Sequence, residues 1–295
     1  MPTLQTPEGR VEYSEVGAGE PIILVHSAPG TVAQWRLLSN VLQDAYQLLA
    51  VNLRGVGASE PWHGRRRLTV DDDASVVRRL MNGRDAAVHL VGHSYGGAVC
   101  LRVALATPGQ QIRTMTLIEP MVYPLLRAAG HDGLFAEAVD PVEAFRTAQT
   151  APAIESAWQK ATDRYHGAGA WTALPELVRT TLLARTPIVV ERCHALLSNS
   201  TSAADLRSLA VNTLVLCGER TCEPERRLSE IVSSLIQGSA FQMIKAAGHM
   251  SPLTHPIEVA TAIRAHAAGR SAELSDRAGL ERPTRNPDDT SQARV

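Results

Sequence analysis

The sequence predicts an α/β protein built on a mostly parallel sheet, and three observations support that prediction. Short apolar runs bounded by turn residues alternate with amphipathic stretches of helical length. The chain has 295 residues, enough for one large core with an inserted subdomain. Its composition, 44% hydrophobic and 20% charged, is typical of a globular protein. Strands and helices that alternate in this way form a sheet with helices on both faces.

The short apolar runs are the predicted strands, because buried parallel strands are apolar along their whole length. They span 22–25, 48–51, 88–91, 115–118 and 213–216, with a weaker run at 241–244. Segments 3–6 and 10–16 look like an antiparallel hairpin at the sheet edge, turned at Pro7-Glu8-Gly9. Together these segments predict an eight-stranded sheet.

Helical patterns separate the strands at 33–43, 72–83, 95–106, 223–236 and 256–268. Between about 121 and 207 no strand is predicted, and residues 134–149, 152–165, 173–184 and 187–198 all have helical patterns. We therefore expect a core formed by 1–120 and 208–269, with a helical lid at 121–207 over the carboxyl edge of the sheet. The polar stretch 270–295, rich in Arg, Asp, Ser and Pro, is predicted to be a disordered tail.

Charge and motifs exclude several classes of function. The formal net charge of −1 argues against nucleic acid or an anionic membrane as a partner. No run approaches the roughly 18 apolar residues of a membrane span, and no signal peptide is visible, so we expect a cytoplasmic protein. The four cysteines form no CxxC pair and are expected to be reduced thiols. No phosphate loop, dinucleotide fingerprint or HExxH motif is present, so we expect no cofactor and no metal. A small-molecule substrate is the expected partner, and the oligomeric state is open.

The most informative segment is Gly92-His93-Ser94-Tyr95-Gly96, which follows a predicted strand and opens a predicted helix. A serine at such a sharp turn has a strained backbone and projects its hydroxyl away from the sheet. Gly92 and Gly96 come close together there, so neither has room for a side chain. The following helix directs its N-terminal amides at the reacting oxygen. Ser94 is therefore the candidate nucleophile.

With this turn, residues 20–270 resemble the α/β-hydrolase superfamily, in particular the esterase and haloperoxidase-like serine hydrolases. His26-Ser27-Ala28-Pro29-Gly30 is similar to the oxyanion loop of the superfamily. The resemblance implies that the amides of Ala28 and Tyr95 bind the oxyanion, and that His26 is structural. Ser27 stands where glycine is usual, which leaves the choice of the first donor open.

Two further segments carry the resemblance. Ala247-Gly248-His249 is similar to the histidine loop after the last strand, and the resemblance makes His249 the base. A neutral imidazole, with a usual pKa of about 6.5, suits proton transfer near neutral pH. The turn at 52–59 is similar to a structural turn of the superfamily, with Asn52 in place of aspartate, and we assign it no chemistry.

The acid that would orient His249 departs from the usual pattern. The superfamily most often places an aspartate after the seventh strand, where this chain has Thr221. A second location among relatives is the end of the sixth strand, and there this chain has Glu119. We therefore propose Glu119 as the acid, since a buried carboxylate needs a partner. A lid contact or a pair with Arg54 is the structural alternative for Glu119, and Glu219 and Glu223 are the next candidate acids.

These residues predict hydrolysis of a carboxylic ester of a small, apolar substrate through an acyl-enzyme. Epoxide hydrolases and haloalkane dehalogenases of this fold use an aspartate nucleophile, so Ser94 argues against both. Hydrolysis of a carbon–carbon bond or a thioester by the same Ser and His is the alternative enzyme. A non-catalytic ligand-binding protein on the same scaffold is the alternative from another class. The apolar pocket is inferred from lid residues Leu174, Leu177, Leu182, Leu183 and Ile188.

Overall fold

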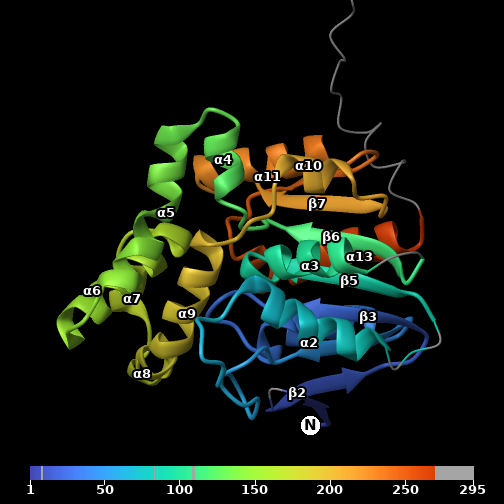
Figure 1. The fold of residues 1–295 in the computed structure, drawn as a ribbon, viewed down its shortest axis with the longest axis horizontal. Helices are drawn as coiled ribbons and strands as arrows, with labels where there is room; N and C mark the ends of the chain where they lie inside the picture. Colours follow the sequence, from blue (N-terminus) through green and yellow to red (C-terminus); the bar gives the residue numbers. More distant parts are fainter. Residues whose placement is uncertain (8, 83, 85, 108–109, 270–295) are drawn as a thin grey trace, which may run out of the picture.

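The protein is described by a computed structural model that covers residues 1–7, 9–82, 84, 86–107 and 110–269. Glu8 of the predicted turn and the predicted tail at 270–295 lie outside the described residues. The fold is an eight-stranded sheet in the order β1-β2-β4-β3-β5-β6-β7-β8, with helices around it (Figure 1). The strands are β1 (Thr3–Thr6), β2 (Gly9–Val16), β3 (Glu20–Val25), β4 (Tyr46–Val51), β5 (Val88–His93), β6 (Ile112–Ile118), β7 (Thr213–Gly218) and β8 (Ala240–Ile244).

The prediction of a mostly parallel sheet is confirmed. β1 and β2 form an antiparallel pair at one edge, and β2 is also antiparallel to β4. All pairs from β4 to β8 are parallel. The register aligns His93 on β5 with Ile118 on β6, so Ser94 and Glu119 leave neighbouring strands at the same edge of the sheet. This carboxyl edge is where parallel α/β proteins place their ligands.

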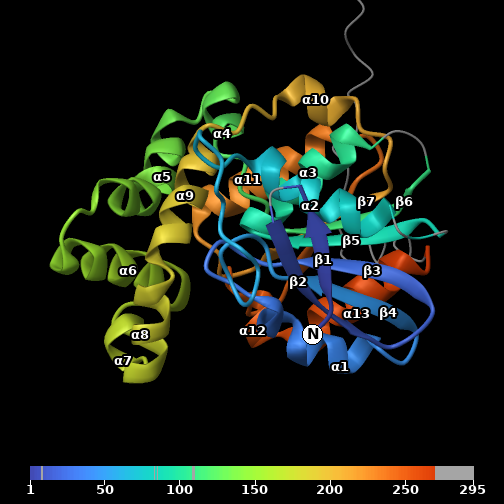
Figure 2. The same ribbon diagram turned by 60° about the horizontal axis from the view of Figure 1, so that its bottom comes forward.

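Helices cover both faces of the sheet (Figures 1 and 2). On one face α1 and α13 pack together, and Leu38 and Ile263 join the apolar side chains of β3 and β4 there. On the other face α2, α3 and α11 contribute to a second, larger core. The bounds are η1 (Val32–Trp35), α1 (Arg36–Leu42), α2 (Val70–Asn82), α3 (Tyr95–Ala106), α11 (Glu223–Leu235), α12 (Ser251–Thr254) and α13 (Pro256–Ala267).

Residues 121–207, which we call the insertion, connect β6 to β7. The structure describes all of them, and their regular elements are all helices. Figure 1 shows most of it as a helical group beside one end of the sheet. The predicted helix at 173–184 corresponds to α8 and begins only at Glu176, because Leu174 precedes Pro175 and takes an extended conformation (ψ 139°) that separates α8 from α7. The helices are α4 (Pro124–Ala128), α5 (Asp132–Thr147), α6 (Ala151–His166), α7 (Ala170–Ala173), α8 (Glu176–Ala184), α9 (Thr186–Leu197) and α10 (Ala203–Arg207).

Aromatic side chains hold the insertion together. Trp158 makes an edge-to-face contact with Phe145 at 4.9 Å and a stacked contact with Trp171 at 6.4 Å between ring centroids. All three side chains are buried in the larger core. None of the described helices combines the length and the apolar character needed to cross a membrane.

Candidate active site

Ser94 lies at the turn between β5 and α3 with φ 57° and ψ −115°. This left-handed conformation is unfavourable for a residue with a side chain and persists only where the surroundings enforce it. Here the Ser94 amide donates to the carbonyl of Ile118 at 2.9 Å, and the Ser94 carbonyl accepts from the amide of Gly97 at 3.0 Å. A Cβ on Gly92 would collide with the carbonyl of Gly96. The tight turn therefore requires the glycine that the motif supplies.

The loop after β3 presents the first expected oxyanion donor. In the described part of the chain, the amides of Ala28 and Tyr95 donate to no protein acceptor, so both are available to a ligand. The Oε1 atom of Gln34 accepts from the Ser27 amide at 3.2 Å and from the Ser27 hydroxyl at 2.8 Å. The φ of Ser27 is not positive, so its Cβ adds no backbone strain at the position where glycine is usual.

Both ring nitrogens of His26 make hydrogen bonds to main-chain groups. Nε2 accepts from the amide of Leu53 at 3.1 Å, which leaves Nδ1 to donate to the carbonyl of Ser27 at 2.7 Å. Burial and the nearby Arg192 lower the pKa of His26 to about 3, so the ring is neutral. The ring joins the loops after β3 and β4, as the structural interpretation of His26 requires.

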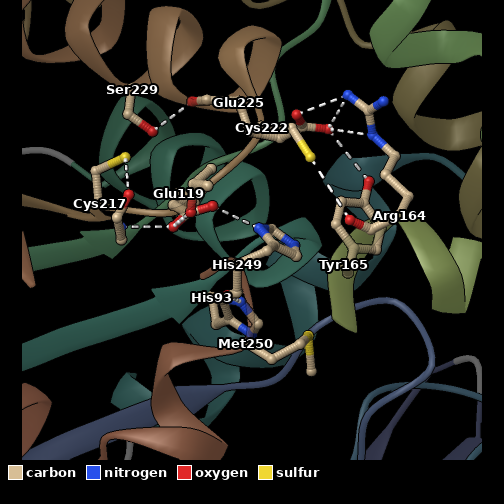
Figure 3. A network of polar contacts seen from close by, with 12 residues as sticks. His93, Glu119, Arg164, Tyr165, Cys217, Cys222, Glu225, Ser229, His249 and Met250 are labelled. Carbon is tan, nitrogen blue, oxygen red and sulfur yellow. Dashed lines mark hydrogen bonds and ion pairs between the residues drawn. The ribbon is translucent and has the colours of Figure 1, made fainter. Parts of the chain in front are cut away.

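Glu119 follows β6 with φ 45° and contacts the ring of His249 (Figure 3). His249 Nδ1 lies 2.7 Å from Glu119 Oε2, and both side chains are buried. The other carboxylate oxygen accepts from the Gly218 amide at 2.8 Å and from the Thr221 hydroxyl at 2.6 Å. Because a carboxylate accepts, Nδ1 carries the hydrogen and Nε2 has a free lone pair. The arrangement suits a general base.

The other candidate acids lie elsewhere. Glu219 is exposed, and its carboxylate accepts from the amide of Ala246 at 2.8 Å. Glu223 is exposed in the first turn of α11. Neither carboxylate contacts the His249 ring in the described structure. Thr221, at the usual position of the acid, instead donates its hydroxyl to Glu119, a role that the sequence did not suggest.

Two further rings surround His249, and sequence reasoning assigned neither to the site. His93 donates from Nε2 to the His249 carbonyl at 2.9 Å, and the ring centroids lie 4.9 Å apart. Burial holds the pKa of His93 well below its usual value, so this ring is neutral. The ring of Tyr165 on α6 also lies beside His249, with 4.4 Å between ring centroids (Figure 3). The position of His93 directly before Ser94, inside the Gly-x-Ser-x-Gly motif, could have indicated that His93 lies at the site.

Ser94 and His249 line one cavity of about 500 Å³ between the sheet edge and the insertion. Among the described residues no hydrogen bond joins the Ser94 hydroxyl to the His249 ring, and such contacts often tighten only in the substrate complex. Leu174 and Leu182 line the cavity as expected, but Leu177 is 79% exposed and Ile188 packs against Val56 and Leu68 instead. The other apolar or aromatic lining residues include Tyr123, Val142, Phe145, Trp158, Tyr165, Val189 and Leu196.

The model of the alpha/beta hydrolase family matches residues 22–262, most of the chain. The chain belongs to the alpha/beta hydrolase family. It is 36% identical over 118 residues to a dihydrolipoyllysine-residue acetyltransferase component of an acetoin cleaving system from Cupriavidus necator, a match covering 38% of this chain and 30% of that protein. It is 35% identical over 98 residues to a soluble epoxide hydrolase from Corynebacterium sp., covering 32% and 33%. The matches thus span about a third of these relatives.

Solved structures support the same fold assignment. A thermophilic esterase from Thermogutta terrifontis superimposes with a TM-score of 0.71 at 24% identity, covering 91% of this chain and 97% of that one. In this alpha/beta hydrolase the described residues contain no group of three or more His, Cys, Asp or Glu that could hold a metal ion.

A buried arginine of this alpha/beta hydrolase connects the insertion to Ala28 and, through Asp73, to Tyr95, the two expected oxyanion donors. Arg192 of α9 donates to the carbonyl of Ala28 at 2.6 Å and lies 3.7 Å from Asp73. Asp73 in turn accepts from the Tyr95 hydroxyl at 2.8 Å, and burial raises the pKa of Asp73 despite Arg192. The sequence analysis did not assign this network. The sequence feature that could have indicated this network is an arginine within the apolar stripe of a predicted helix. A fully buried arginine requires partners.

Proposed function

We propose that this alpha/beta hydrolase is a serine hydrolase that cleaves carboxylic esters through an acyl-enzyme. One observation carries the proposal. A single cavity is lined both by Ser94, presented at a strained strand-to-helix turn, and by His249, whose Nδ1 is bound to the buried carboxylate of Glu119. This arrangement supports the roles of nucleophile, base and orienting acid that acyl transfer needs.

Each group has a role in the proposed reaction. Nε2 of His249 takes the proton of the Ser94 hydroxyl as its oxygen attacks the ester carbonyl carbon. The amides of Ala28 and Tyr95 donate to the oxyanion, and Glu119 stabilises the imidazolium. The proton then passes from His249 to the leaving alcohol, and the acyl-enzyme remains. A water molecule repeats the attack with the same base, which releases the acid and regenerates the Ser94 hydroxyl.

The residue at the nucleophile position favours esters over epoxides. One relative is a soluble epoxide hydrolase, but epoxide hydrolases of this fold open the ring with an aspartate, and this chain has Ser94. Hydrolysis of a thioester or of a carbon–carbon bond would use the same three side chains. Assays with different substrates, and not the identity of the catalytic residues, therefore distinguish those two reactions from ester hydrolysis.

A fluorophosphonate probe and an ester assay test the proposal together. The wild-type protein is expected to be labelled and to hydrolyse 4-nitrophenyl butyrate, and Ser94→Ala is expected to abolish both. Ser198→Ala, which changes an exposed serine of the insertion, is the matched control and is expected to behave as the wild type.

The remaining outcomes separate the alternatives. A folded wild-type protein that is neither labelled nor active would favour the non-catalytic binder. A protein that is labelled on Ser94 but inactive on esters would be assayed with acyl-CoA thioesters and with a 2-hydroxy-6-oxo-dienoate. Turnover of either compound would replace the ester proposal.

A further inference from the structure

Arg185 brings a positive charge to a mainly apolar cavity wall. It lies between α8 and α9, and it is the single Arg or Lys among the residues that line the active-site cavity. No Asp or Glu lines that cavity, and all of the lining residues belong to the described part of the chain. A cation placed against apolar walls is costly unless an anion or several acceptors compensate it.

The protein itself supplies little compensation. Nη1 of Arg185 donates to the carbonyl of Pro29 at 2.8 Å, which uses one of the five N–H groups of the guanidinium. Arg185 forms no ion pair with any described residue. Burial and repulsion from Arg192 lower the pKa of Arg185, and no carboxylate opposes that shift. By contrast, two other arginines of the insertion face buried carboxylates, Arg164 at Glu225 and Arg192 at Asp73.

The anchoring point places the charge on the oxyanion side of the cavity. Pro29 follows Ala28, whose amide is the proposed oxyanion donor, and both residues line the same cavity as Ser94. The guanidinium is planar and has N–H groups left over, so it matches a carboxylate through two parallel hydrogen bonds. The side chain of Arg185 is partly buried, and the mainly apolar lining of the cavity strengthens such a pair.

We propose that Arg185 binds a carboxylate of the substrate, so that the preferred esters carry a free carboxylate on an otherwise apolar chain. This inference rests on the proposed function and adds a substrate class to it. It differs from a purely structural role for Arg185, in which the side chain only ties the insertion to the Pro29 carbonyl. A structural role would affect charged and neutral substrates alike.

Three esters of similar length test the proposal. They are the mono-4-nitrophenyl ester of adipic acid, its neutral methyl-capped analogue, and 4-nitrophenyl hexanoate. After subtraction of uncatalysed hydrolysis, the wild type is expected to show a kcat/KM about 10- to 100-fold higher for the carboxylate ester, the range for one charge-assisted pair. Arg185→Gln is expected to abolish this preference and to leave the two neutral esters within about threefold of the wild type.

Two variants sharpen the comparison. Arg185→Lys keeps the charge without the planar fork and is expected to retain part of the preference. Arg179→Gln removes a charge on α8 that lies outside the cavity, and it is expected to preserve the wild-type ratio. Equal kcat/KM values for charged and neutral esters in the wild type, or an equal loss on all three esters in Arg185→Gln, would overturn the assignment and leave the serine hydrolase proposal intact.

A binding measurement keeps the inference testable if no ester is hydrolysed. Calorimetric titration of Ser94→Ala with adipate is expected to show binding, and Ser94→Ala/Arg185→Gln is expected to show at least a tenfold weaker affinity. Absence of adipate binding to Ser94→Ala would overturn the carboxylate site. Binding without ester turnover would retain the carboxylate site while the proposed function failed.

Discussion

The carboxyl edge of the sheet and the insertion form one cavity, but they are held in place by different interactions. At the sheet edge, Ser94 and Glu119 have left-handed backbones and are fixed by main-chain hydrogen bonds to Ile118 and Leu216 on neighbouring strands. The insertion reaches the sheet edge through side chains, with Tyr165 over His249 and two arginines at the carbonyls of Ala28 and Pro29.

We expect this difference to separate the chemistry from the choice of substrate. A side chain at a position fixed by several strands can hold a reactive geometry whatever the insertion contributes, as functional sites on rigid elements do. A wall made of helices that pack through side chains can change its lining with little effect on that geometry. We therefore expect substitutions at the sheet edge to lower turnover of every substrate. Substitutions of the insertion side chains that line the cavity are expected to change which substrate is preferred.

The largest effect is expected for Glu119→Gln at the sheet edge. The amide of Gln cannot stabilise an imidazolium, and its NH₂ group would favour the wrong tautomer of His249. Loss of the triad acid lowers kcat by about 10⁴-fold in serine proteases, and a similar loss is expected here for all esters tested. Steady-state kinetics with 4-nitrophenyl butyrate would measure it, with circular dichroism to verify the fold.

Glu219→Gln is the matched control for that prediction. It changes an exposed carboxylate in the adjacent loop, whose partner is the amide of Ala246. We expect its kcat to stay within a factor of about two, because surface substitutions rarely disturb a site they do not touch. A Glu119→Gln variant with wild-type kcat would remove Glu119 as the acid.

A second prediction tests how strongly the insertion is tied to the sheet edge. Arg192→Met removes the cation beside buried Asp73 and the donor to the Ala28 carbonyl. Breaking a buried pair by removing one partner costs about 3–5 kcal/mol in the free energy of unfolding. Urea denaturation would measure the change in the free energy of unfolding. We expect kcat to fall as well, because the loop with the proposed oxyanion donor Ala28 loses its support.

An exposed pair in the same insertion provides the control. Arg146 and Glu143 on α5 form an ion pair in which both side chains are about 41% exposed. Arg146→Met is expected to cost less than about 1 kcal/mol, as exposed pairs generally do. Equal losses in the two variants would mean that Arg192 does not anchor the insertion.

The sequence predicted the sheet edge better than the insertion, for a physical reason. The turn around Ser94 needs glycines at fixed spacing, and buried parallel strands need continuous apolar runs, so both leave a readable pattern. The strand register then brings Glu119 beside the Ser94 strand. The contacts of Arg192 and Arg185 depend on how distant helices pack. The sequence shows only that Arg192 lies in a predicted helix and that Arg185 lies between two of them.

At the sheet edge, the role of Thr221 could not be predicted from a sequence motif. The departure from aspartate was visible, but the hydrogen bond from its hydroxyl to Glu119 required the register of β7 against β6. Residues that support another side chain carry no spacing rule of their own. Their roles follow from the distances between loops of neighbouring strands.

The smallest effect is expected for Thr221→Val, which removes the 2.6 Å hydrogen bond to Glu119 without changing the size of the side chain much. Glu119 retains the Gly218 amide and His249, so its carboxylate remains held but has lost one of its donors. A hydrogen bond to a charged group contributes about 1.5–3 kcal/mol, and part of it should appear as a roughly tenfold fall in kcat on charged and neutral esters alike. Thr221→Ser retains the hydroxyl and should recover most of the wild-type kcat. If Thr221→Val altered only the preference between charged and neutral esters, a sheet-edge residue would act as we expect for the insertion. That result would contradict the proposed difference between the two regions.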